Sequence, residues 1–269
     1  MNRSVAVIWK SVPADLPDQL KRSVASGLAR RAGRAPTLLF FRADDVGIPS
    51  AQLNRMLETF HRTGVPLSLA MVPAWLTRPR WTAIQNMAKG SAPRWHWHQH
   101  GFRHYNHEVC GKKQEFGPGR SPHQIHHDLN AGRSRLAAIT NGRCADFFTP
   151  PWNRCSPETL AQLRHLEYQG ISRSRGARPR SPQGLPDLPV TLDLHTRRDR
   201  NPQSGWAHLL AQLNQDFSMG YCGVMLHHQR MNRAAHCVLE LLLQLVVKNK
   251  DIRLVHLGQA AATFSAGHF

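Results

Sequence analysis

The sequence predicts an α/β fold, a single domain built on parallel strands with a helix between successive strands. The first observation is that short apolar runs alternate with amphipathic, capped segments from residue 37 onward. The second is size, because 269 residues with 41% hydrophobic content can fill one large core. The third is the strand count, about seven or eight, which fits an open doubly wound sheet or a closed barrel and favours the barrel.

In the first half of the chain, each expected strand is followed by a helix with recognisable ends. The first strand is a run of apolar and aromatic residues, which is typical of a buried strand. The strands cover residues 37–42, 67–72 and 95–100. The N-cap and stop residues of the helices are Ser50 and Gly64, Thr77 and Gly90, and Ser121 and Gly142.

The second half continues the same order with shorter strands. Strands are expected at residues 145–149, 171–174, 190–194, 222–226 and 252–257. Helices are expected at residues 157–169, 206–217 and 233–247. Two long irregular stretches, 101–121 and 175–189, are rich in glycine, proline and charge, and loops of this length within a domain are usually functional.

Charge and domain organisation limit the classes of partner. Residues 1–36 are expected to form a basic N-terminal extension with a helix at 15–31, ahead of a catalytic barrel over 37–269. The formal net charge of +18 suits an anionic substrate or surface. The arginines are spread along the chain without a zinc-finger, RRM or basic-zipper pattern, so nucleic acid is not expected as a partner.

The lengths of the apolar runs and the spacing of the cysteines indicate the cellular compartment. No run reaches the roughly 18 apolar residues of a membrane span, and the apolar stretch before Lys10 is too short for a secretory leader. The five cysteines are widely spaced and include no C-x-x-C pair, which argues against a disulfide framework and a thiolate zinc site. A cytoplasmic protein is therefore expected.

Polar residues follow the first strand and the third. Asp44 and Asp45 come directly after the first apolar run, where the backbone can turn and present both carboxylates to one site. Five of the 17 histidines fall within twelve residues, and among them His100 and His104 lie four apart at the end of the third strand. One carboxylate and two imidazoles form the three-ligand, open-position site of catalytic zinc. His107, in the following loop, is a candidate for substrate or supporting contact.

Two further groups complete the predicted ring of polar residues. Trp152, Asn153 and Arg154 follow the strand at 145–149, in a loop that two prolines stiffen and that suits sugar stacking and an oxyanion site. His227 and His228 follow the strand at 222–226, where a proton donor is expected. Asp193 and His195, at the end of another strand, are expected to orient that acid or line the cleft.

Together, these residues are typical of a site for metal-assisted hydrolysis. A metal held by Asp45, His100 and His104 would lower the pKa of a bound water to about 7 and polarise a carbonyl. Asp44 is the candidate base. A histidine across the cleft, with its near-neutral pKa, is the candidate acid that protonates the leaving amine.

At these residues the sequence resembles the polysaccharide deacetylase family, also called NodB-homology or family 4 carbohydrate esterases. The motifs that carry the resemblance are Arg42-Ala-Asp-Asp45 (F-D-D), His100-Gly-Phe-Arg-His104 (H-x-x-x-H), Thr149-Pro-Pro-Trp-Asn153 (R-x-P-Y/W) and Met225-Leu-His227 (L-H). They occur in the family's order over roughly residues 37–257. The stretches W-H-Q-H-G, K-K-Q-E-F-G and P-P-W-N-R-C are similar to a bacterial subgroup tied to lipopolysaccharide or other surface-glycan biosynthesis.

The resemblance implies a distorted (β/α)7 barrel and removal of the acetyl group from an N-acetylated amino sugar of a polysaccharide or glycolipid. It implies Asp44 as base, His227 as acid and a divalent metal, Zn²⁺ ahead of Co²⁺ or Mn²⁺. Thr149 departs from the pattern, because it stands where the family has an arginine that orients the base. Arg42 and Arg154 are the candidate replacements. The family's D-x-x-D-W type motif is also replaced, by residues 193–199.

Two other functions fit the same residues. One is hydrolysis of another non-peptide C–N bond on the same metal scaffold. The other is a catalytically degenerate barrel that binds a glycan or an anionic partner through its basic surface.

Overall fold

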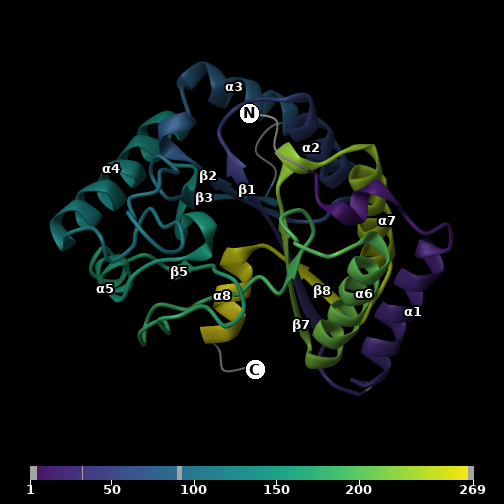
Figure 1. The fold of residues 1–269 in the computed structure, drawn as a ribbon. Helices are drawn as coiled ribbons and strands as arrows, with labels where there is room; N and C mark the ends of the chain where they lie inside the picture. Colours follow the sequence, from purple (N-terminus) through teal and green to yellow (C-terminus); the bar gives the residue numbers. More distant parts are fainter. Residues whose placement is uncertain (1–4, 32, 90–92, 266–269) are drawn as a thin grey trace.

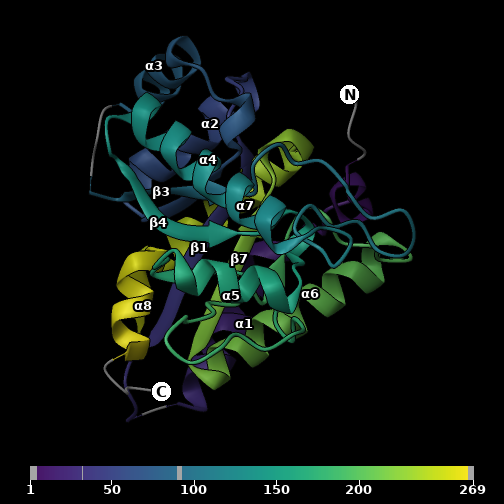
Figure 2. The same cartoon turned by 90° about the vertical axis from the view of Figure 1, so that its left-hand side faces the viewer.

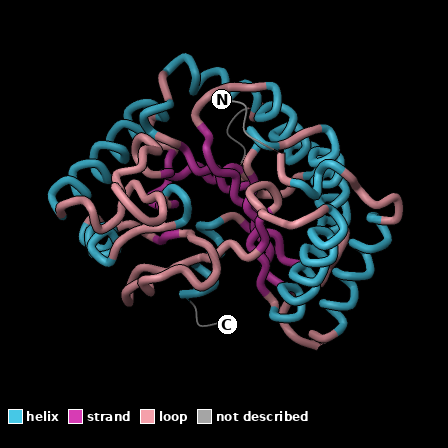
Figure 3. The backbone as a smooth tube through the Cα atoms, in the orientation of Figure 1, coloured by secondary structure: helices cyan, strands magenta, loops and turns pink. Residues whose placement is uncertain are grey.

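The computed structural model describes residues 5–31, 33–89 and 93–265 of the chain. Its strands are all parallel and run in the order β5-β4-β3-β2-β1-β7-β6, with β8 paired to β1. They curl into a half-barrel, with helix α8 (Leu257–Ser265) inside the curve and the other helices on its outer side (Figures 1 and 3). The strands are β1 (Thr37–Val46), β2 (Leu67–Met71), β3 (Trp95–His100), β4 (Cys144–Thr149), β5 (Gly170–Ile171), β6 (Leu192–Asp193), β7 (Tyr221–Leu226) and β8 (Ile252–Val255). The predicted α/β barrel is confirmed.

The helices follow the predicted order. They are α1 (Leu16–Ala29), α2 (Ala51–Thr63), α3 (Arg78–Met87), α4 (Pro122–Thr140), α5 (Pro157–His165), α6 (Pro202–Met219), α7 (Arg233–Val247) and α8 (Leu257–Ser265). Short 3-10 turns lie at Val7–Lys10, Pro73–Trp75, Pro151–Asn153 and His228–Arg230. The side chains of Ser50, Thr77, Ser121 and Ser156 accept hydrogen bonds at the helix starts, as their sequence positions predicted. The predicted stop at Gly90 lies outside the described residues.

The half-barrel is distorted where its strands are shortest. Between β5 and β6, the segment 187–190 forms isolated parallel bridges with residues 171 and 174. The backbone N–H groups of Leu188 and Val190 donate to the carbonyl oxygens of Ile171 and Arg173 at 2.8 and 2.7 Å. This segment continues into β6, so hydrogen bonds link the two ends of the strand order.

Strand β1 is buried along its whole length and separates two cores. Leu39 and Phe41 face outward, into the large core between strands and helices. Leu38 and Phe40 face inward, where α8 packs against them. Figures 1 and 2 show α8 at the end of the sheet away from α2 and α3. This helix was not predicted, and it fills the interior beside the first half of β1, leaving the other end for polar residues.

The N-terminal segment packs closely against the barrel. Helix α1 lies beside α6 (Figure 1), and Asn214 donates to the carbonyl oxygen of Ser23 at 2.9 Å. A Cβ on Gly27 would come within 2.6 Å of the Asn214 carbonyl oxygen, so only glycine permits this approach. The indole of Trp9 donates to the carbonyl oxygen of Leu194 at 2.9 Å. The division of the chain at residue 36 stays a prediction.

All five cysteines are free thiols, as expected. Over the described ranges, none of the helices combines the length and apolarity that crossing a membrane requires.

Candidate metal centre and active site

Strand β1 brings two neighbouring carboxylates into one polar cluster. Asp44 and Asp45 are each 2% exposed, although neighbours in a regular strand point to opposite faces. The pairing of β1 with β2 shifts register between Ala43 and Val46, and Asp45 adopts a left-handed φ of 62°. The bulge redirects one side chain. The strand therefore turns within its last residues, and not beyond its end as the sequence suggested.

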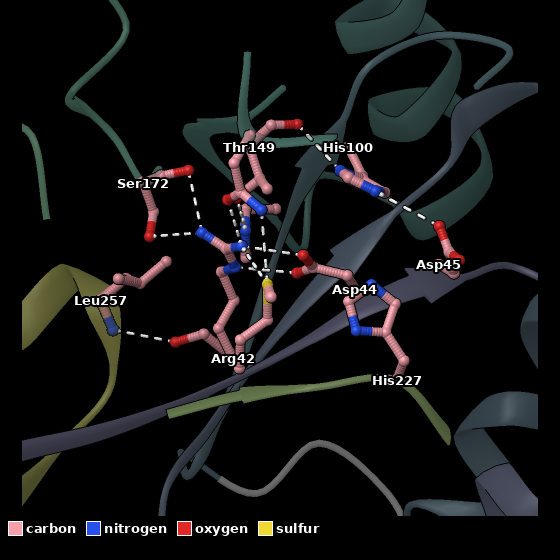
Figure 4. A network of polar contacts seen from close by, with 12 residues as sticks. Arg42, Asp44, Asp45, His100, Thr149, Ser172, His227 and Leu257 are labelled. Carbon is pink, nitrogen blue, oxygen red and sulfur yellow. Dashed lines mark hydrogen bonds and ion pairs between the residues drawn. The ribbon is translucent and has the colours of Figure 1, made fainter. Parts of the chain in front are cut away.

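Arg42 fixes the orientation of Asp44. Its Nε donates to Oδ1 and its Nη2 donates to Oδ2, both at 2.8 Å. Its Nη1 donates to the backbone oxygen and Oγ of Ser172 at 2.9 and 2.8 Å, and Nη2 also donates to Oδ1 of Asn153 at 2.7 Å (Figure 4). Arg42 is 0% exposed. A buried charge of this kind is tolerated because every part of the guanidinium is paired.

The histidines of β3 share its inner face. His96, His98 and His100 alternate with two tryptophans that belong to the outer core. The ring of His96 stacks on that of His256, with 4.7 Å between centroids. Nε2 of His98 lies 2.9 Å from Oγ1 of Thr149. His96 and His98 are thus packed residues beside the cluster that His100 enters.

The atoms of Asp45, His100 and His104 converge on one point. Oδ1 of Asp45 lies 3.4 Å from Nε2 of His100 and 3.1 Å from Nε2 of His104. One ligand atom from each residue falls within 4.8 Å of the others. Tetrahedral zinc, with bonds of about 2.0–2.1 Å, places its ligands roughly 3.3 Å apart. The spacing and donor set therefore fit a divalent metal that keeps an open coordination position.

A hydrogen bond to the backbone fixes the orientation of the His100 ring. Its Nδ1 lies 2.9 Å from the carbonyl oxygen of Thr149, which can only accept, so Nδ1 carries a proton (Figure 4). In the neutral ring the lone pair is then on Nε2, directed at Asp45. Thr149, which stands where the resembled family has arginine, thus contacts the candidate ligand His100 through its backbone oxygen and His98 through its hydroxyl.

The cluster favours charge separation between Asp45 and His100. Burial disfavours the ionised carboxyl of Asp45, but hydrogen bonds from His100 and His104 and the nearby His227 outweigh it and hold its pKa well below the usual value. Burial acts against protonation of His100, yet the hydrogen bond to Asp45 and the charges of Asp44 and Asp45 raise its pKa. A cation at this point would replace the proton on His100 and satisfy the same carboxylate.

The loop after β4 places an aromatic face beside the candidate metal ligands. Trp152 and Asn153 have left-handed φ values of 57° and 59°, which cost free energy in residues other than glycine. The Trp152 ring lies edge-on to that of His104, with 4.6 Å between centroids. Asn153 contacts Arg42, as described above. Arg154 points elsewhere and donates to the backbone oxygen of Lys113 at 3.4 Å, so Arg42 is the arginine that contacts Asp44.

The end of β7 carries His227 to the same cluster (Figure 4). Its Nδ1 is buried and has no hydrogen-bond partner among the described residues. Its backbone N–H donates to Nδ1 of His195 at 3.1 Å. Burial, followed by the charge of His227, holds the pKa of His195 well below its usual value. His195 is therefore a neutral support for the backbone of His227, and His228 is buried in the next turn.

Like Arg154, two further predicted site residues make their contacts away from the clustered ligands. Asp193 accepts the backbone N–H groups of His195 and Thr196 at 2.9 and 2.8 Å, and its second oxygen accepts the hydroxyl of Thr196. It thus stabilises its own turn. His107 packs against Tyr105 within the loop 101–121, with 5.1 Å between centroids.

Sequence reasoning missed two contacts of His104. Trp75, after β2, has its ring 5.6 Å from that of His104. Glu115 accepts a hydrogen bond from the His104 backbone N–H at 3.1 Å. Glu115 belongs to the K-K-Q-E-F-G stretch, but neither the spacing nor the composition of that stretch shows which backbone groups it contacts.

No family model matches the chain, and no curated protein matches it. Solved structures do. One from Mycobacterium smegmatis, assigned to the polysaccharide deacetylases, is 16% identical with a TM-score of 0.65, covering 87% of this chain and 92% of the other. A family 4 acetyl xylan esterase from Clostridium thermocellum, in complex with a cobalt ion, is 14% identical with a TM-score of 0.53, covering 85% and 92%. A family 4 pseudoenzyme from Bacillus anthracis is 13% identical with a TM-score of 0.52, covering 84% and 66%.

These identities establish the architecture. The chain has the fold of the polysaccharide deacetylases and family 4 carbohydrate esterases, which is the fold that its sequence motifs implied.

Proposed function

We propose that this protein is a metal-dependent hydrolase that removes acetyl groups from N-acetylated amino sugars of a polysaccharide or glycolipid. One observation carries the proposal: Asp45, His100 and His104 converge at metal-ligand spacing next to Asp44, which Arg42 orients through both oxygens. The fold neighbours, which include polysaccharide deacetylases and a cobalt-bound acetyl xylan esterase, support the choice of substrate class.

Asp45, His100 and His104 would hold the metal, and zinc suits one carboxylate and two imidazoles. The metal would supply an activated water and a polarised carbonyl. Asp44 would accept the proton of that water on its carboxylate, which Arg42 keeps at a fixed angle. His227 would donate a proton to the leaving amine, and its Nδ1 is not engaged by the described residues.

The remaining groups would bind and orient the sugar. Trp152 offers a partly exposed ring beside His104 for stacking on a sugar face. The formal charge of +18 would attract an anionic glycan or glycolipid at long range. His195 would keep His227 in place through its backbone contact.

Acetate release tests this proposal. Wild-type protein would be loaded with Zn²⁺, Co²⁺ or Mn²⁺ and screened over acetylated glycans and glycolipid precursors. Asp44→Asn should lower acetate release by about 100-fold or more, the scale of a lost general base, while the bound metal stays at the wild-type ratio. Asp146→Asn is a matched control, because Asp146 forms a half-exposed ion pair with Arg133 at the start of β4.

The alternatives give different results. Retained activity in Asp44→Asn would remove Asp44 from the role of base. Cleavage of another C–N bond without acetate release would favour the hydrolase of different specificity. Metal and glycan binding without turnover would favour the degenerate barrel. The Bacillus anthracis neighbour is described as a family 4 pseudoenzyme.

A further inference from the structure

We infer that Glu115 is a positioning residue that holds the metal ligand His104 in place through three consecutive peptide groups. The inference rests on the proposed function, because it assumes that His104 binds a metal. Glu115 lies in the loop 101–121 and is 0% exposed. It is not one of the three clustered ligands.

The carboxylate of Glu115 accepts three backbone hydrogen bonds in succession. Phe102 N–H donates to Oε2 at 3.2 Å, Arg103 N–H donates to Oε1 at 2.6 Å, and His104 N–H donates to Oε2 at 3.1 Å. Successive N–H groups that point into one concavity form an anion-binding nest. Here the anion is a side chain of the protein itself, so the nest fixes the path of the chain that carries His104.

The backbone of residues 101–104 ends in a conformation that its last residue does not favour by itself. His104 has a left-handed φ of 57°, which is unfavourable for a residue with a side chain. Gly101 has a φ of 58°, and a Cβ there would come within 2.1 Å of Oε2 of Glu115 and 2.5 Å of Pro151 Cγ. The close approach of the carboxylate therefore depends on glycine at the start of the segment, and the carboxylate in turn stabilises the strained residue at its end.

Glu115 is itself fixed to the barrel. The next residue, Phe116, is 0% exposed and forms a parallel bridge with Cys155. Its carbonyl oxygen accepts Ser156 N–H and the hydroxyl of Thr159, both at 2.8 Å. These bonds connect Glu115 to the start of α5. Glu115 thereby connects the backbone of His104 to the barrel. His100 is oriented differently, by a hydrogen bond from its ring to Thr149.

The test compares Glu115→Gln with Glu108→Gln. Glutamine keeps the shape of Glu115 but offers one accepting oxygen in place of two, so at least one N–H of the nest loses its acceptor. Glu108 lies in the same loop and accepts Gly119 N–H at 3.1 Å, away from residues 101–104. Glu115→Asp, which keeps the charge and shortens the side chain, serves as the second variant.

The measurement is Co²⁺ binding by titration, together with the visible absorption spectrum of the Co²⁺ protein. Glu115→Gln should weaken Co²⁺ binding about 10–100-fold, the usual effect of losing a group that orients a ligand, and should change the spectrum. Glu108→Gln should match the wild type in both. Glu115→Asp should lie between Glu115→Gln and the wild type.

Three outcomes would overturn the inference. They are unchanged affinity and spectrum in Glu115→Gln, an equal loss in Glu108→Gln, and, if Glu115→Gln does not fold, wild-type binding and spectrum in Glu115→Asp. A wild-type protein that binds no Co²⁺ would instead refute the proposed function itself.

Discussion

Arg42 and Asp44 lie two residues apart on β1 and form a two-point ion pair inside the barrel, with both nitrogen–oxygen distances at 2.8 Å. Their side chains are 0% and 2% exposed. Residues two apart on a strand share a face, so the proposed base and the arginine that orients it come from the same few residues of the chain. Any movement of this part of β1 would carry both together.

Replacing Arg42 tests whether this pair sets the reactivity of Asp44. Arg42→Lys keeps the charge but loses the planar, two-point contact. We expect kcat for acetate release to fall about 100-fold, on the scale of a misoriented catalytic group, with KM and metal content near the wild-type values. Arg133→Lys, in a half-exposed ion pair with Asp146, is the matched control. An unchanged kcat in folded Arg42→Lys would show that Asp44 needs no orientation by arginine.

Gly101 combines a left-handed φ with close neighbours, so we expect its replacement to lower the free energy of unfolding more than usual. In Gly101→Ala, the left-handed φ costs about 1–2 kcal/mol, and the new Cβ also meets Glu115 and Pro151 at 2.1 and 2.5 Å. Gly142 has a similar φ of 73° with nothing within 4 Å of a new Cβ, so Gly142→Ala should cost only the backbone part. Urea unfolding at equilibrium measures both costs. Equal losses of unfolding free energy would show that the segment at Gly101 relaxes freely.

The lowered pKa of His96 predicts that the folded protein loses stability in acid. Burial, followed by the charge of His256, lowers the pKa of His96 to about 3, while the unfolded value is about 6.5. The unfolded chain therefore binds the extra proton between these values, and unfolding becomes easier as pH falls below about 6.5. From pH 7.5 to pH 5 this one group should remove about 2 kcal/mol from the free energy of unfolding.

The variant His96→Gln isolates that contribution. It lacks the titrating ring, so its free energy of unfolding should fall by about 2 kcal/mol less than that of the wild type between pH 7.5 and pH 5. Urea unfolding of both proteins at the two pH values gives the difference. Identical losses would assign the acid sensitivity to other groups, such as His236, whose pKa burial and Arg55 lower to about 4.

The alternation of strands and helices was predictable because its signals are local. Serine and threonine caps, glycine stops and apolar spacing all act within a few residues, and they placed α2 to α5 close to their observed bounds. Helix α8 escaped prediction because its start lacks a serine or threonine cap. His256 and Gln259 instead exchange backbone and side-chain hydrogen bonds there, and the N–H of Leu257 donates to Oγ of Ser68, which lies 189 residues earlier in the chain. Such a partner has no local signature.

The candidate site was predictable to the extent that it depends on strand ends. Asp45, His100 and His104 meet because parallel strands end on one side of the sheet. The bulge at Asp45 and the role of Glu115 depend on backbone geometry. The contacts of Asp193 were not predictable, because a strand-end carboxylate can stabilise its own turn as readily as face the site.

Metal stoichiometry shows whether Asp45, His100 and His104 bind a divalent cation. Purified wild-type protein, stripped with chelator and reloaded with Zn²⁺, should retain one metal per chain by elemental analysis. Asp45→Asn and His104→Ala should retain well under one, because each removes a ligand from the cluster. A wild-type protein that holds no divalent metal after reloading with Zn²⁺, Co²⁺ or Mn²⁺ would contradict the account.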